Sequence, residues 1–231
     1  MGIVGGGVYV VCYIILVRRH TEVFVIRYRV LVWLGLAFVA ACAQAHTGAK
    51  APDSAAQFRE ALVAQGVADQ AIRDTLIRLM QSGSMADTSL ISRQNLGDAR
   101  RASWLSAQVA EHGWPKEGVV GAEAADAAFL IVQHAVHDTV FQARMLVQLS
   151  EAARVKEASP QNVALLTDRL MIRRGQRQLY GTQASLRDGR IMLDPISDST
   201  NVDARRAQIG LPPLSEYLRK LESVYAPKPT P

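Results

Sequence analysis

Apolar residues recur at helical spacing through most of the chain from Ser54 onward. Phe58, Leu62 and Val63 form one such apolar face, and the same spacing of three and four residues returns in each later segment. Glycine and Ser-Pro signals mark where helices end and begin. The pattern predicts helices from Ser54 to a stop at Gly66, then to Ser82-Gly83, 87–112, 121–135, 139–156, 159–175, 201–210 and 214–225.

One segment after Gly175 breaks the helical pattern. Residues 179–186 and 190–193 flank Arg187-Asp188-Gly189, and Asp-Gly is a strong signal for a tight turn between antiparallel strands. We therefore predict one small β-hairpin within residues 179–193. The expected fold class is mainly α, as a single compact helical domain over residues 53–226 with a loose Pro-rich tail at 227–231.

The first 41 residues differ from the rest and predict a signal or membrane leader. Arg27 and Arg29 precede an apolar run from Val30 to Phe38, and small residues follow, which is the anatomy of a secretory signal. Neither this run nor the apolar Gly2–Val17 reaches the ~20 residues that a spanning helix needs. Because the leader is long for a lipoprotein, a start at Val25, read from a GTG codon, is one alternative.

The end of the leader offers two cleavage sites. Val39-Ala40-Ala41-Cys42 matches the lipobox of bacterial lipoproteins, in which the cysteine is acylated and becomes the mature N-terminus. Ala43-Gln44-Ala45 fits ordinary signal cleavage, which would release a soluble periplasmic protein, and an uncleaved membrane anchor is a third alternative. The favoured prediction is a lipoprotein of the cell envelope, held in the membrane by lipidated Cys42 and facing the periplasm, with residues 42–52 as its tether.

The net charge of +5 over 231 residues becomes less informative once it is divided along the chain. Residues 1–41 hold four arginines and one glutamate, so they carry +3 and the remainder carries +2. Since aromatic residues make up only 6% and the arginine pairs are interleaved with acids, nucleic-acid binding is not expected. Cys12 lies in the leader and Cys42 would be acylated, so we predict no disulfide, and no motif predicts a resident metal or cofactor.

Polar residues that interrupt apolar segments are the candidate site, and the first group is Gln133-His134 with Asp138. Residues four apart share one face of a continuous helix, so Asp138 could pair with His134. An imidazole oriented in this way can act as a general base or a metal ligand. The alternative is a core histidine whose hydrogen bond is satisfied within the protein.

Two further groups follow in the second half of the chain. Asp168 and Arg169 lie on an apolar helix, and such residues are rarely buried unless paired, so one of them is expected to form a structural ion pair. The second group consists of Gln178, Tyr180, Thr182 and Gln183. These polar side chains could line a ligand-binding pocket, or they could form hydrogen bonds within the protein at the edge of a turn.

These groups belong to an ordered series of motifs. The series contains Gly113-Trp114-Pro115, Gln133-His134-Ala135, Asp138, Phe141-Gln142, Asp168-Arg169, Gln178-x-Tyr180-Gly181-Thr182-Gln183 and Glu216-Tyr217-Leu218. Over about Leu96 to Leu221 it resembles the bacterial domain-of-unknown-function family 6624. The resemblance implies that the candidate residues belong together, and it implies no activity. Val136 occupies the position at which the family often has an acidic residue. A catalytic mechanism that uses two carboxylates at this helix is therefore not expected.

Two classes of function fit these observations. The first is a non-enzymatic envelope domain that binds a protein or a small ligand. The second is a hydrolase in which His134 is the general base, Asp138 orients it, and Arg169 or the amides of residues 178–183 stabilise a developing anion. Its metal-dependent version would use His112, His137-Asp138 and Asp168, in the order found in all-α phosphohydrolases. The sequence leaves open whether the protein is an enzyme.

Overall fold

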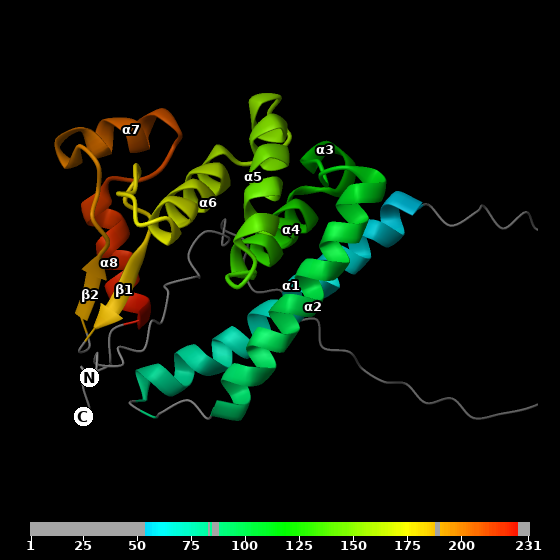
Figure 1. The fold of residues 1–231 in the computed structure, drawn as a ribbon, viewed down its shortest axis with the longest axis horizontal. Coiled ribbons are helices and arrows are strands. Elements are labelled where there is room, and N and C mark those ends of the chain that lie inside the picture. Colours follow the sequence, from blue (N-terminus) through cyan, green and yellow to red (C-terminus); the bar gives the residue numbers. More distant parts are fainter. Residues whose placement is uncertain (1–53, 83, 85–87, 188–189, 226–231) are drawn as a thin grey trace, which may run out of the picture.

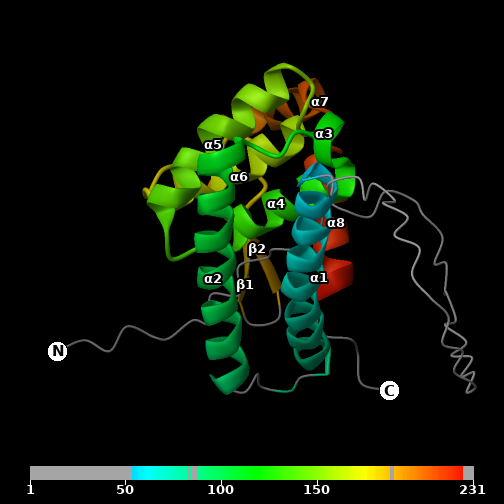
Figure 2. The same ribbon diagram turned by 90° about the vertical axis from the view of Figure 1, so that its right-hand side faces the viewer.

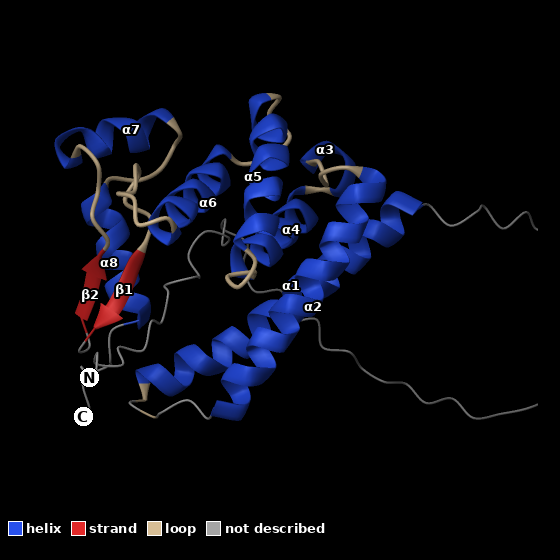
Figure 3. Ribbon diagram, viewed as in Figure 1, coloured by secondary structure: helices blue, strands red, loops and turns tan. Residues whose placement is uncertain are grey.

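The computed structural model describes residues 54–82, 84, 88–187 and 190–225 (Figure 1). Within them the chain is mainly helical, with one small antiparallel hairpin (Figure 3). The helices are α1 (Ser54–Gln81), α2 (Thr88–His112), α3 (Glu117–Val120), α4 (Ala122–His134), α5 (Thr139–Arg154), α6 (Pro160–Arg173), α7 (Val202–Gln208) and α8 (Leu214–Tyr225). The predicted leader, Cys42, the tether and the tail lie outside the described residues, and none of the described helices has the length and apolarity to cross a bilayer.

The longest helix, α1, does not end at Gly66 as predicted. It runs on to Gln81, and Gly66 lies where α1 packs against α4. A Cβ placed on Gly66 would come within 2.8 Å of the Ala127 Cβ. The glycine therefore permits a close approach of two helices, and the prediction of a helix stop there was wrong.

The apolar helix α4 is the centre of the main core. Most of its side chains are buried, as its hydrophobicity on nearly all sides predicts. It contacts α1, α2, α3 and α5. Figure 2 shows α1 and α2 running side by side along one edge of the molecule. Leu62, Leu105, Phe129 and Leu166 bring α1, α2, α4 and α6 into this core.

A second, smaller core lies around the hairpin. Strands β1 (Ala184–Arg187) and β2 (Arg190–Leu193) pair antiparallel, with Ala184 opposite Leu193. Ala184 packs with Tyr217, Leu221 and Tyr225 of α8. The hairpin prediction is confirmed, but its first strand begins at Ala184, because residues 178–183 form a loop instead.

Candidate functional site

His134 is buried at the last turn of α4, with 1% of its surface exposed. Its Nδ1 lies 2.8 Å from Oδ2 of Asp69, which α1 carries. A carboxylate can only accept a hydrogen bond, so the imidazole donates through Nδ1. The partner of the histidine ring is therefore a residue 65 positions earlier in the chain.

Three further charged residues surround this pair and bring α2 into it. Arg73 donates to Asp69 at 2.8 Å and to Asp98 at 2.7 Å, and Arg101 donates to Asp98 at 2.7 Å. The Arg101 Nε lies 3.5 Å from Asp69 Oδ1. All five residues are buried, and we call them the Asp69 network.

The charges of the Asp69 network balance when His134 is neutral, since two guanidinium groups face two carboxylates. Burial alone would raise the pKa of Asp69, but His134, Arg73 and Arg101 together hold it below the ordinary value. Burial lowers the pKa of His134, and Arg73 lowers it further, against the opposite effect of Asp69. The imidazole is thus held in its neutral form, as a structural hydrogen-bond donor.

Asp138 does not share a helical face with His134. Helix α4 ends at His134, and Asp138 is the residue that caps α5, where its side chain accepts from the Phe141 N–H at 2.8 Å. The predicted pairing of His134 with Asp138 assumed a continuous helix, and that assumption was wrong. Asp138 is exposed, next to His137.

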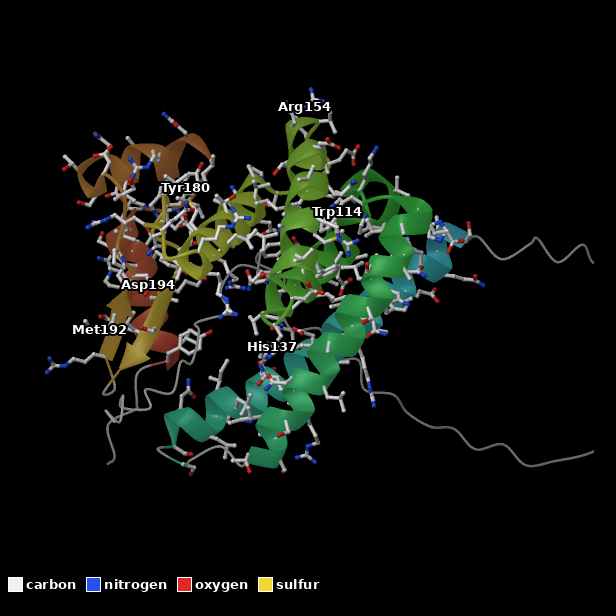
Figure 4. All side chains as sticks on the ribbon, in the orientation of Figure 1. Trp114, His137, Arg154, Tyr180, Met192 and Asp194 are labelled. Carbon is white, nitrogen blue, oxygen red and sulfur yellow. The ribbon has the colours of Figure 1, made fainter. Side chains whose placement is uncertain are left out.

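Asp168 of α6 is fully buried and binds the backbone of the loop at residues 178–183. Its carboxylate accepts from the backbone N–H of Leu179 at 2.7 Å, of Tyr180 at 3.1 Å and of Thr182 at 3.0 Å, and from the Thr182 hydroxyl at 2.9 Å. Burial raises the pKa of Asp168, although these hydrogen bonds act in the opposite direction. Asp168 therefore fixes the shape of the loop that Figure 4 marks at Tyr180.

The glutamine side chains of this loop form hydrogen bonds within the protein. The Gln178 side chain accepts from the Gln183 N–H at 2.8 Å and donates to the Gln183 carbonyl at 2.9 Å. Arg169 donates to the Gln183 side chain at 3.1 Å and to the Gln133 carbonyl. The same carbonyl accepts from the Gln142 side chain at 3.2 Å. These contacts join the loop to the end of α4, whereas the His134 ring bonds to Asp69 and the Asp138 side chain caps α5.

On the surface of the described residues, one hollow lies at each end of α5. The larger, about 640 Å³, is lined by Gly113-Trp114-Pro115 and by parts of α1, α3 and α5; we call it the Trp114 hollow. The smaller, about 390 Å³, is lined by Asp98, Ser106, His137, Asp138 and Arg144 among others; we call it the Asp138 hollow. Figure 4 shows Arg154 at the upper end of α5, Trp114 beside the middle of this helix and His137 near its lower end.

Of the residues predicted as catalytic or ligand-binding, Asp138 is the one that lines either of these two hollows of the described surface. His112 lies at the Trp114 hollow and His137-Asp138 at the other, while Asp168 is buried in the loop contact. Across the described ranges, no group of three or more His, Cys, Asp or Glu is placed to hold a metal ion.

Comparison with known proteins decides the family. The chain matches a family of unknown function, DUF6624, over residues 56–229. The protein belongs to DUF6624. No curated protein and no solved structure matches it. The match extends to α1, about forty residues before the motif series that first indicated the DUF6624 resemblance.

Four of the five members of the Asp69 network were missed from the sequence. A signal does exist, because Leu62, Gly66, Asp69 and Arg73 follow at spacings of three and four along one face of α1. Charged residues at such positions of an apolar stripe predict buried ion pairs. That Asp69 would meet His134 follows only from how α1 and α4 pack in the fold.

We expect Asp69→Ala to lower the free energy of unfolding by about 3–5 kcal/mol, because it leaves two buried guanidinium groups facing only the Asp98 carboxylate and removes the acceptor of His134. Asp74→Ala, at an exposed position one turn away on α1, is the matched control and should change it by less than about 0.5 kcal/mol. Urea unfolding followed by circular dichroism measures both. Equal, small effects of the two substitutions would contradict the structural role of Asp69.

Proposed function

We propose that this DUF6624 protein is a ligand-binding domain of the bacterial cell envelope, anchored through a lipid on Cys42, and that the Trp114 hollow receives a small ligand. The observation that carries the proposal is a contrast in the described residues. His134, Asp168 and Arg169 are engaged in hydrogen bonds inside the protein, whereas the Trp114 hollow opens to the surface and is lined largely by apolar side chains.

A hydrolase needs a base or an anion-stabilising group that can reach a substrate. The imidazole of His134 is covered and bonded to Asp69, and both carboxylate oxygens of Asp168 accept hydrogen bonds from the loop. Arg169 is buried between Gln133 and Gln183. A substrate could reach these groups only if the core opened, which makes a binding role the better fit.

The Trp114 hollow has the properties of a ligand site. Its volume lies within the range of about 300–1,000 Å³ that is usual for small-molecule sites. Val119 and Val155 at its rim are 63% and 52% exposed, so large apolar surfaces remain in contact with water. A ligand that covered them would gain about 25 cal/mol for each Å² of apolar surface removed from water.

The envelope location rests on the lipobox sequence that ends at Cys42. Ser54 and Ala55 at the start of α1 line the Trp114 hollow. A tether of about a dozen residues would therefore place this hollow close to the membrane surface, since an extended chain spans at most about 3.3–3.6 Å per residue.

A hydrolase at the Asp138 hollow is the second candidate. The observation in its favour is that His137, Asp138 and Arg144 meet there with Ser106, which accepts a hydrogen bond from Arg144 at 3.1 Å. An exposed imidazole and carboxylate at a hollow can activate water. This version replaces His134 by His137 and makes no use of Asp168 or Arg169.

The anchor is tested by metabolic labelling of the full chain with radioactive palmitate. We expect label in the protein and none in Cys42→Ser, because the thiol is the only predicted acceptor at the lipobox. Label that persists in Cys42→Ser would exclude this anchor.

The hollow is tested with dansylamide, a neutral aromatic probe that accepts excitation energy from tryptophan. We expect saturable, one-to-one binding to the full chain reconstituted in phosphatidylcholine vesicles. Val119→Asp/Val155→Asp should weaken it at least about tenfold, since two apolar contacts worth about 1.5 kcal/mol or more each become polar. Val140→Asp/Val147→Asp, at exposed positions on α5 outside the hollow, is the matched control.

Two results would contradict the binding proposal. The first is dansylamide binding that both double variants leave unchanged. The second is turnover of p-nitrophenyl phosphate or acetate by the same preparation that is abolished by Asp138→Asn, which would favour the hydrolase at the Asp138 hollow.

A further inference from the structure

The lining of the Trp114 hollow divides into an apolar part and a charged rim. Phe58, Trp114, Val120 and Ala152 form apolar surface between α1, α3 and α5. The rings of Phe58 and His112 lie 5.6 Å apart, tilted by 48°, so an aromatic surface borders the hollow on the side of α1 and α2. Planar or acyl groups are the ligand parts that such a surface accommodates.

The lining also includes Trp114, which is 5% exposed and whose indole N–H has no hydrogen-bond partner among the described residues. This nitrogen is itself covered by protein atoms, so the contacts for a charged ligand group lie at the rim of the hollow.

The rim carries two cations that have no partner in the described part of the chain. Lys116 and Arg154 both line the hollow and are exposed, and neither forms an ion pair there. They come from different elements, the loop before α3 and the last turn of α5. Two cations from separate elements can contact one anionic group from two sides.

One acid lies in the lining of the hollow, and three others lie near it in the chain. Glu151 is the one carboxylate of the lining. Glu157 accepts from the Gly118 N–H at 2.7 Å, whereas Glu111 and Glu117 are exposed and lie outside the lining. With His112 neutral, the side chains of the lining carry a net charge of +1, from Lys116, Arg154 and Glu151.

We propose that the Trp114 hollow binds an anionic amphiphile, whose apolar or aromatic body lies on Phe58, Trp114, Val119 and Val155 and whose negative group lies between Lys116 and Arg154. This inference rests on the proposed function, because it names the ligand class of the same hollow. A carboxylate, sulfonate or phosphate supplies the negative charge and the acceptor atoms that the two cations of the rim can bind. Near a membrane, a fatty acid or a lysolipid belongs to this class, as does a soluble aromatic acid.

The test compares two probes that differ in one group. Dansylate carries a sulfonate where dansylamide carries a neutral sulfonamide, and the two share the same aromatic body. Binding to the full chain in phosphatidylcholine vesicles is followed by energy transfer from tryptophan, with protein-free vesicles as background. We expect dansylate to bind about tenfold more tightly than dansylamide, as charge-assisted hydrogen bonds to two cations imply.

The variant Lys116→Gln/Arg154→Gln should abolish the preference for dansylate and leave dansylamide binding unchanged. The matched control, Arg219→Gln/Lys220→Gln, removes the same two kinds of charge from an exposed part of α8 and should keep the preference. Competition by laurate, by lysophosphatidylglycerol and by 2-naphthoate then separates the membrane-derived from the soluble members of the class.

Equal affinities of the two dyes would overturn the proposed ligand class, and so would a preference for dansylate that survives Lys116→Gln/Arg154→Gln. In either case, dansylamide binding at the hollow would still support the binding function. If neither dye responds to Val119→Asp/Val155→Asp, the hollow is not a ligand site and both proposals fail. Circular dichroism and thermal unfolding of each variant show that a lost signal reflects the site and not the fold.

Discussion

A buried carboxylate on α1 is the constraint on which the arrangement of the main core depends. Asp69 is surrounded by groups from three helices, with Arg73 beside it on α1, Arg101 on α2 and His134 on α4. An unpaired charge in such a place would cost several kcal/mol, so the three helices are held in the register that pairs it. Apolar packing alone tolerates shifts of a helix far more easily than this set of bonds does.

The position of α4 then determines the second half of the molecule. Its last turn presents the Gln133 carbonyl, which accepts from Arg169 of α6 and from Gln142 of α5. Arg169 in turn donates to the side chain of Gln183, the last residue of the loop whose backbone binds Asp168. The Tyr217 hydroxyl donates to the Thr182 carbonyl at 2.8 Å and brings α8 against the hairpin. One continuous set of polar contacts therefore joins the two cores.

Much of this fold could be predicted from local patterns. The helices from Thr88 onward apart from the short α3, the Ser159-Pro160 start and the Asp-Gly hairpin follow from spacing, capping and turn chemistry, which act over a few residues. Gly66 misled the prediction because a glycine that stops a helix and one that permits close helix packing look alike in sequence. The break after His134 was predicted to within one residue, at the end of the 121–135 helix. The pairing of His134 with Asp138 failed because it required a continuous helix across that break.

The candidate site was predictable only in part. Arg169 connects the Gln133 carbonyl with Gln183, and Asp168 binds the adjoining loop. His134 and Asp138 lie apart from this set, because the first bonds to Asp69 and the second caps α5. Asp69 could not be matched with His134 from sequence, since the two meet only through tertiary packing. The Trp114 hollow could not be predicted either, because the ends of α1, α2 and α5 that line it come together only in the folded chain. The Gly-Trp-Pro motif is its one local sequence feature.

The protonation of His134 tests the central claim most directly. Its midpoint can be measured by NMR titration of the folded chain with labelled histidine, assigned through His134→Gln and compared with a histidine peptide that titrates near 6.5. If the Asp69 network is complete with neutral His134, its pKa lies below the peptide value. The unfolding free energy then falls as the pH drops from about 6.5 towards that lower pKa, and His134→Gln removes this dependence. A midpoint at or above the peptide value would show that the core holds an imidazolium, and would contradict the account.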